Sequence, residues 1–180
     1  MEMSEFIKEY EEKRGLSEKI ASYIPGYRGY KQKEVRREAD KLLRDFMIKK
    51  LEVARSGLKN VIKEAADAEA AELFKTLNRL TAIMDRVINK VEHADYGYSG
   101  FFDLVKVRED ELDRLMDYDY RLLGACDEIS RLAGEASRTA TAGSLDMLPN
   151  LLKQLESKLL EFESAFASRE EAIISIKGGA

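Results

Sequence analysis

Tryptophan is absent from this 180-residue sequence, which has only two prolines, one histidine and one cysteine. A single cysteine, Cys126, cannot form an internal disulfide, and its place among apolar helix positions predicts a small buried residue. The scarcity of proline favours long helices. Charged residues make up 36% of the chain, and no long uncharged apolar run predicts a transmembrane helix or a signal peptide. We therefore expect a cytoplasmic protein.

Histidine and cysteine are too few for the common catalytic and metal sites. Such a metal site needs several converging His, Cys or carboxylate ligands, and a Ser-His-Asp arrangement would have only His93 to use. The sequence also lacks a Walker-type phosphate loop and a nucleophile elbow. We therefore expect no enzyme: no catalytic residue, no metal ligand and no cofactor.

Four segments carry apolar residues every three or four positions, the spacing of helices that bury one face. They span residues 31–66, 73–94, 109–141 and 149–176. Joined by short turns, they predict an all-α fold, an antiparallel up-down bundle of four long helices with coiled-coil-like seams. No internal repeat is recognisable. We expect three parts: an N-terminal helical arm (1–24), the helical bundle (25–176) and a frayed tail (177–180).

Residues 31–94 allow two interpretations. A turn near Asp67 would divide them into a helical hairpin, whereas one continuous helix of some 60 residues would be ~90 Å long. A compact domain favours the hairpin. The hairpin would bring two Tyr/Gly-rich pieces, residues 23–30 and 96–103, to the same end of the molecule. We call this end the corner.

The corner is rich in tyrosine, phenylalanine and arginine. Its candidate binding residues are Tyr27, Arg28, Tyr30, Tyr96, Tyr98, Phe101 and Phe102. In one interpretation they are a structural cap, in which aromatic rings close the bundle and glycines permit positive φ. In the other they form a recognition surface, because Tyr and Arg are enriched at binding hot spots. The two interpretations are compatible.

The same two pieces carry a resemblance. Residues 24–41 read IPGYRGYKQKEVRREADK and residues 97–103 read GYSGFFD. With these signatures the chain resembles a family of uncharacterised prokaryotic all-helical proteins over most of its length. The resemblance implies a helical fold and brings no activity, cofactor or catalytic residue.

Charge is unevenly distributed along the chain. Basic residues dominate between positions 30 and 66, acidic residues dominate after position 66, and the net charge is -4. The simplest use of one basic helix in an acidic chain is internal pairing. An external basic stripe for nucleic acid or anionic lipid is the rival interpretation, and the acidic surroundings oppose it. We expect neither nucleic-acid nor membrane binding.

Asp119 falls on the inward phase of its helix, between Leu115 and Leu122. A buried carboxylate needs a partner or becomes protonated. Its distance from the corner predicts an ion pair that fixes the register of the helices. The candidate partners are Arg37, Lys41 and Arg44.

A patch of carboxylates precedes Asp119. Glu109, Asp113 and Asp117 follow one another at i, i+4 spacing, which faintly resembles the acidic helix patches of PhoU-like phosphate-regulation bundles that hold metal clusters. That resemblance implies an alternative function, a small-ligand or metal-binding regulatory bundle. The simpler interpretation is a solvated acidic face or one paired to the basic helix.

The leading hypothesis is a non-enzymatic helical scaffold or adaptor. Its corner would dock a protein partner by protein–protein interaction. The long charged helices with a continuous apolar seam also make a homo-oligomer plausible.

Overall fold

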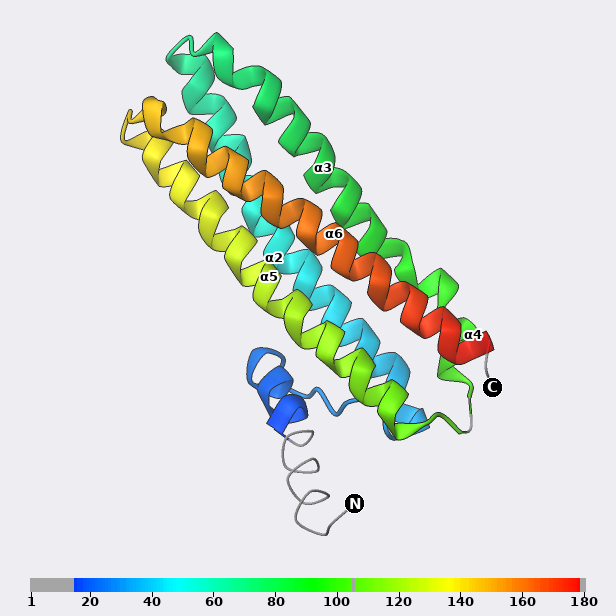
Figure 1. The fold of residues 1–180 in the computed structure, drawn as a ribbon. Helices are drawn as coiled ribbons and strands as arrows, with labels where there is room; N and C mark the ends of the chain where they lie inside the picture. Colours follow the sequence, from blue (N-terminus) through cyan, green and yellow to red (C-terminus); the bar gives the residue numbers. More distant parts are fainter. Residues whose placement is uncertain (1–14, 105, 179–180) are drawn as a thin grey trace.

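A computed structural model describes residues 15–104 and 106–178, and the regular elements within these ranges are helical. Four long helices lie side by side in an elongated bundle (Figure 1): α2 (Lys33–Asp67), α3 (Phe74–His93), α5 (Glu109–Thr141) and α6 (Leu148–Gly178). Four short elements connect them: η1 (Ala71–Leu73), η2 (Ala94–Gly97), α4 (Ser99–Phe102) and η3 (Leu145–Met147). The predicted all-α helical bundle is confirmed.

The turn after α2 shows that residues 31–94 form a helical hairpin and not one continuous helix. The Ala70 N–H donates to the Ala65 carbonyl at 2.9 Å, and the Glu69 N–H donates to the Ala66 carbonyl at 3.1 Å. These two bonds form a Schellman motif, which ends a helix with one residue in the left-handed conformation. That residue is Glu69, with φ of 54°.

The turn after α5 has the same geometry. The Ser144 N–H donates to the Thr139 carbonyl at 3.1 Å, and the Gly143 N–H donates to the Ala140 carbonyl at 2.9 Å. Gly143 is the left-handed residue here, with φ of 76°. A short 3-10 helix and then a long helix follow each turn. The α2–α3 hairpin and the α5–α6 hairpin are therefore structural repeats, although the sequence shows no repeat.

The two hairpins are stacked in the same direction. Helix α2 contacts α3 and α5, and α6 contacts α5 and α3. Four polar contacts between the hairpins join residues 77 positions apart: Lys50 to Asp127, Asn60 to Ser137, Arg79 to Glu156 and Arg86 to Glu163. A constant separation in sequence means that α2 runs parallel to α5 and α3 runs parallel to α6. Antiparallel packing is thus found within each hairpin and parallel packing between them.

The parallel pair α2 and α5 approaches closely where small residues meet. A Cβ added at Gly57 would lie 3.0 Å from the Ala133 carbonyl oxygen. Inward-facing apolar residues from all four long helices, among them Leu43, Leu77 and Leu159, are buried in one core. This tight packing fixes the ends of the helices relative to one another.

The two repeated turns offer a matched test of backbone strain. A side chain in the left-handed region costs about 1 kcal/mol relative to glycine. We therefore expect Glu69→Gly to raise the free energy of unfolding by about 0.5–1 kcal/mol, and Gly143→Ala to lower it by about 1 kcal/mol. Urea denaturation of both variants measures the two changes. A lower stability for Glu69→Gly would contradict the assigned turn geometry.

The N-terminal arm is described from residue 15 onward, and residues 15–23 are helical. Ile20 is fully buried, and the Tyr23 ring packs edge-on against Phe46 of α2 and Tyr120 of α5. The expected arm before residue 15 and the final two residues of the expected tail lie outside the described part of the chain. Over the described residues, no helix has the length and apolar character needed to cross a membrane.

Candidate functional site

The two Tyr/Gly-rich pieces meet at one end of the bundle. The rings of Tyr30 and Phe101 pack edge to face with centroids 6.1 Å apart. The Tyr30 and Tyr98 hydroxyl oxygens both accept hydrogen bonds from Arg169, at 3.1 and 3.3 Å. The α2–α3 hairpin returns the chain to its starting end and brings these segments together. The predicted meeting of the two pieces is confirmed.

Most of the corner faces inward. Tyr27, Tyr30, Tyr98, Phe101 and Phe102 are each at most 5% exposed. Their rings fill the open end of the bundle, so in this conformation they cannot contact a partner. For these five residues the recognition-surface interpretation is corrected to that of a structural cap.

Arg28 and Tyr96 are the two candidate corner residues that remain exposed. Tyr96 is 82% exposed, the highest value among the exposed large hydrophobic side chains of the described chain. Its ring stacks on the His93 ring, with centroids 6.2 Å apart and planes 17° from parallel. The His93 Nδ1 atom lies 2.9 Å from the Asn89 carbonyl oxygen, one helical turn back. An exposed aromatic pair is thereby held against the end of α3.

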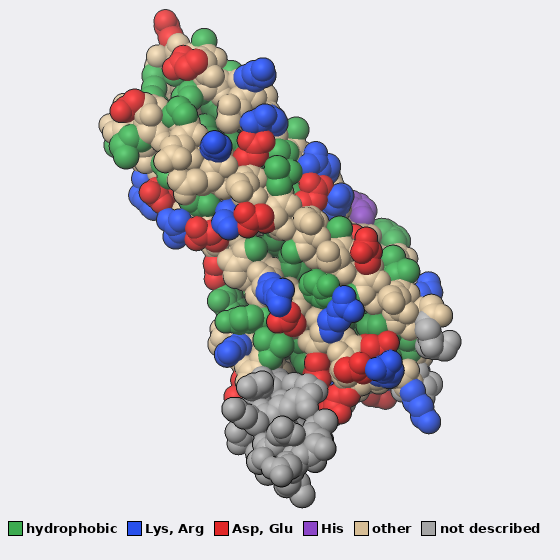
Figure 2. Space-filling view, in the orientation of Figure 1, with side chains coloured by type: hydrophobic (Ala, Val, Ile, Leu, Met, Phe, Trp, Pro, Cys, Tyr) green, Lys and Arg blue, Asp and Glu red, His purple; other side chains and the backbone are tan. Residues whose placement is uncertain are grey.

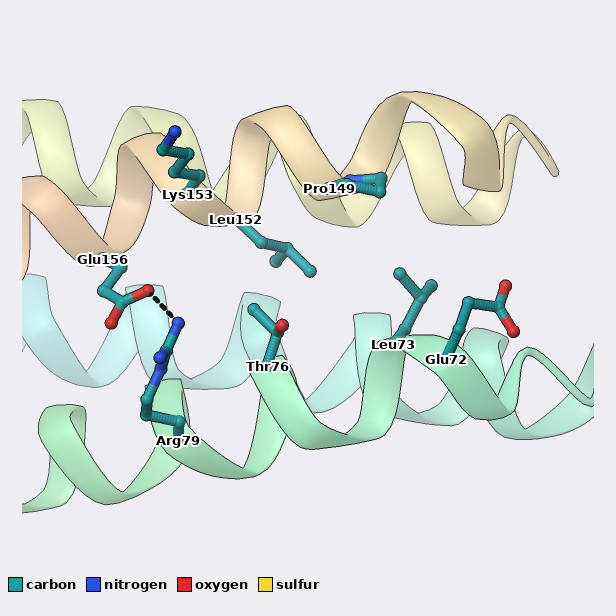
Figure 3. Close-up of a pocket in the computed structure, with 8 residues that line it drawn as sticks. All are labelled: Glu72, Leu73, Thr76, Arg79, Pro149, Leu152, Lys153 and Glu156. Atoms are coloured by element: carbon teal, nitrogen blue, oxygen red, sulfur yellow. Dashed lines mark hydrogen bonds and ion pairs between the residues drawn. The ribbon is translucent and has the colours of Figure 1, made fainter.

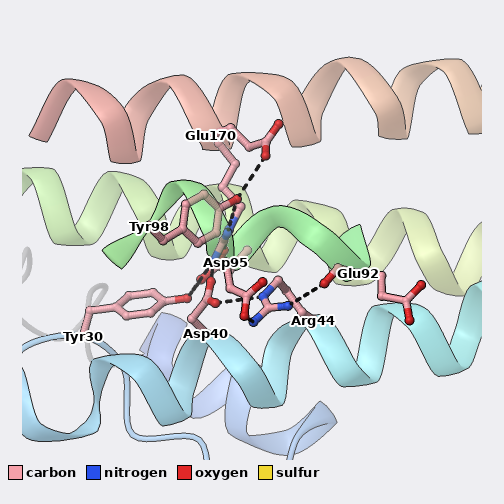
Figure 4. Close-up of polar contacts among 9 residues, drawn as sticks. Tyr30, Asp40, Arg44, Glu92, Asp95, Tyr98 and Glu170 are labelled. Atoms are coloured by element: carbon pink, nitrogen blue, oxygen red, sulfur yellow. Dashed lines mark hydrogen bonds and ion pairs between the residues drawn. The ribbon is translucent and has the colours of Figure 1, made fainter. Parts of the chain in front are cut away.

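Arg169 is the centre of the polar contacts beneath the corner. Its side chain is fully buried on α6. The Nε atom donates to Asp119 at 2.6 Å, and Nη2 donates to Asp40 at 2.8 Å. With the two tyrosine hydroxyls, one guanidinium therefore joins α6 to α2, α5, the loop before α2 and the residue before α4. Figure 4 shows Tyr30, Tyr98 and Asp40 converging from these separate segments.

A second arginine extends the cluster toward α3. Arg44 donates through Nε to Asp40 at 2.9 Å, one helical turn away on α2. It also donates to the Glu92 carbonyl at 3.3 Å and lies 3.7 Å from the Asp95 carboxylate. Two arginines thus balance two buried aspartates. We call this set the Arg169 network: Tyr30, Asp40, Arg44, Tyr98, Asp119 and Arg169.

The protonation states of the network follow from its burial. Burial raises the pKa of Asp119, while the Arg169 guanidinium and the Tyr30 hydroxyl act in the opposite direction. Burial and the Asp119 charge raise the pKa of Tyr30 well above its usual value. Tyr30 therefore keeps its proton and donates it to Asp119 in a bond of 2.5 Å. The network satisfies the buried charges with one another, so removal of one member would leave another buried without its partner.

Asp119 is buried and paired, but its predicted partners were wrong. Arg44 is bonded to Asp40 on its own helix, Arg37 lies over the Phe102 ring at 4.7 Å, and Lys41 is exposed. The partner is Arg169 of α6. The reason is that the fully buried Asp119 carboxylate meets α6 across the α5–α6 hairpin, where Arg169 reaches both Asp119 and Asp40.

Arg169 could have been found from the sequence. The inward positions of α6 include Phe162, Phe166, Arg169 and Ile173, at spacings of four, three and four. A charged residue on the buried phase of a helix was the signal that identified Asp119. The same signal applies to Arg169. Two opposite charges at buried helix positions are expected to pair with each other.

A third arginine fastens the two loops of the corner. Arg36 is buried on α2. It donates through Nε to the Tyr30 carbonyl and through Nη1 to the Leu104 carbonyl, both at 2.7 Å. Its guanidinium also lies 5.8 Å from the centre of the Phe101 ring. These contacts satisfy loop carbonyls that the helices leave unpaired.

The acidic patch of α5 is engaged within the chain. Glu109 pairs with Lys31, Asp117 pairs with Arg121, and Asp119 belongs to the Arg169 network. Within residues 15–104 and 106–178, no three His, Cys, Asp or Glu side chains are arranged to hold a metal ion. The structure thus offers no specific observation in favour of the metal-binding alternative.

Comparison of the chain with protein-family models, curated proteins and solved structures gave no match. The resemblance to a prokaryotic helical family stays a prediction.

Proposed function

We propose that this protein is a non-enzymatic helical scaffold or adaptor that binds another protein through the Tyr96–His93 pair. The observation that carries the proposal is the 82% exposure of a tyrosine whose ring is held by stacking. Tyrosine is enriched among the few residues that dominate binding energy at protein interfaces. An exposed ring with a fixed orientation suits this role.

The support beneath Tyr96 strengthens the proposal. Arg44 contacts both the Glu92 carbonyl and the Asp95 carboxylate, and it is bonded to the buried Asp40. The segment that carries the aromatic pair is therefore tied to the core. A preorganised surface loses less conformational entropy on binding than a flexible one. In this account the buried cap and the exposed pair have separate tasks, folding and recognition.

A cytoplasmic setting is part of the proposal. The only cysteine, Cys126, is fully buried, and burial raises the pKa of its thiol well above the usual value. A protonated, inaccessible thiol suits a reducing compartment, where proteins do without disulfides.

Substitution of Tyr96 by alanine tests the proposal. Val53 is 57% exposed on α2, far along the chain from the corner, and Val53→Ala is the matched control. We expect both variants to unfold within about 0.5 kcal/mol of the parent, because both side chains are exposed. Affinity for the partner should fall by tenfold or more, about 1.4 kcal/mol, in Tyr96→Ala and remain unchanged in Val53→Ala.

The partner can be sought with a photo-crosslinking amino acid placed at position 96 and, separately, at position 53. A discrete adduct formed from position 96 alone identifies the protein whose affinity is then measured. If Tyr96→Ala binds that protein as tightly as the parent does, the proposed docking role is wrong. The proposed role is also wrong if position 96 gives no adduct, or gives only adducts that position 53 gives as well.

A further inference from the structure

A cleft opens at the end of the bundle opposite the corner, between the first turns of α3 and α6 (Figure 3). Its volume is about 370 Å³. Leu73 and Leu152, both buried, form an apolar floor together with Thr76 and Pro149. A liquid water occupies about 30 Å³, so the cleft has room for a large side chain as well as solvent.

Opposite charges stand on the two sides of the cleft. Glu72 lies on the α3 side near the turn, and Lys153 lies further along on the α6 side, with Pro149 between them (Figure 3). Both are exposed, and neither has an ion-pair partner within the described residues. In contrast, Arg79 and Glu156, which close the far side of the cleft, are bonded to each other at 2.6 Å.

An exposed methionine precedes Pro149, one of the residues that line the cleft, by two positions. Met147 is the last residue of η3, two positions before Pro149, and its side chain is 59% exposed. Methionine is unbranched and flexible, so it fills irregular apolar spaces well. The equivalent turn of the first hairpin has Leu73 at the corresponding place, and that side chain is buried. At this position the second hairpin therefore exposes an apolar side chain, whereas the first hairpin buries one.

We propose that this cleft is the interface of a homodimer with twofold symmetry. A twofold interface is formed by the same patch on both copies, so each group must meet a complementary group of that same patch. An axis passing near Pro149 brings Glu72 of each copy to Lys153 of the other. The two Met147 side chains then lie close to the axis and enter the apolar clefts. The same patch therefore supplies both the acidic and the basic residue of each ion pair.

Charge exchange provides the test. Sedimentation velocity from about 1 µM to 1 mM should show a dimer that dissociates on dilution. Glu72→Lys and Lys153→Glu should each raise the dissociation constant by about tenfold, because two attractive contacts become two repulsive ones. The double variant Glu72→Lys/Lys153→Glu should return it to within about threefold of the parent. Met147→Ser should also weaken the dimer. Lys59→Glu should not, because Lys59 is exposed on α2 and has no ion-pair partner among the described residues.

Three outcomes would overturn the proposal. The first is a monomer at every concentration. The second is a dimer that none of these substitutions affects. The third is a double variant no tighter than the two single variants. All the substituted side chains are exposed, and circular dichroism of each variant establishes that it is folded. None of these results depends on Tyr96, so the dimer and the proposed docking role are tested independently.

Discussion

Arg169→Met should lower the free energy of unfolding by about 3–5 kcal/mol, the cost of removing one member of a buried ion pair. Arg169 is fully buried and bonded to Asp119, Asp40 and two tyrosine hydroxyls. Methionine retains the apolar contacts of the arginine stem but leaves Asp119 with a single donor, Tyr30. Chemical denaturation at neutral pH measures the loss.

The same variant should respond to pH with a definite sign. Burial already raises the pKa of Asp119 in the folded parent, and removal of Arg169 should raise it further. A carboxyl group whose pKa is higher in the folded state binds its proton more tightly there, so stability falls as pH rises between the unfolded and folded pKa values. The deficit of Arg169→Met relative to the parent should therefore be smaller near pH 5 than at pH 8.

Arg79→Met is the control for Arg169→Met. Arg79 also pairs across the two hairpins, with Glu156, but its side chain is 59% exposed. Exposed pairs contribute about 0–1 kcal/mol. A loss for Arg169→Met no larger than that for Arg79→Met would show that the buried network does not support the corner.

The double substitution Tyr27→Ala with Tyr98→Ala should unfold the protein or leave it barely stable. Both tyrosines are at most 5% exposed. Truncating a buried aromatic side chain typically costs about 3–5 kcal/mol, and a whole domain is stable by only about 5–15 kcal/mol. Circular dichroism and thermal melting measure the effect. A normally stable double variant that had lost only partner binding would restore the recognition-surface interpretation of these residues.

Single hydroxyl deletions separate packing from hydrogen bonding in the cap. The Tyr98 hydroxyl accepts a bond from Arg169, whereas the Tyr27 hydroxyl makes no hydrogen bond within the described part of the chain. Tyr98→Phe should cost about 1–2 kcal/mol, since the hydrogen bond from Arg169 and the longer one donated to Glu170 at 3.5 Å are both lost. Tyr27→Phe should be close to neutral. Equal losses from the two would argue against the assigned network.

The sequence predicted the fold because its helices are strongly periodic. The buried positions of α3, Leu77, Leu80, Met84, Val87 and Val91, follow the spacing read from the sequence. The fold-back near Asp67 was also predictable, although Glu69 is a poor residue for a left-handed turn. Length was the decisive argument there, because one unbroken helix could not pack in a compact domain.

The stacking of the two hairpins was not predictable from these seams. An apolar face indicates that one side of a helix is buried, but it does not indicate which neighbouring helix covers that side. Whether α2 lies beside α5 or beside α6 depends on how the chain crosses between hairpins through α4. The error in the partner of Asp119 has a different cause, because Arg169 lies across the α5–α6 hairpin from it and the charge at this inward position of α6 was missed.

Burial of the corner was open for a similar reason. Tyrosine, phenylalanine and glycine are suited both to caps and to binding surfaces, so composition favoured a cap without deciding between the two interpretations. The structure separates Tyr98, 1% exposed, from Tyr96, 82% exposed, only two positions apart. Tyr96 lies within η2 and Tyr98 follows it, and nothing in the composition of this segment indicates which of the two rings is buried.

A double-mutant cycle between Arg169 and Asp119 is the most direct test of the central account, in which a buried ion network joins segments distant in sequence. The four proteins are the parent, Arg169→Met, Asp119→Asn and the double variant. The cycle should give a coupling free energy of about 2 kcal/mol or more, with the double variant more stable than Arg169→Met alone, because the uncompensated buried charge is gone. Additive losses, with no coupling between the two positions, would contradict the account.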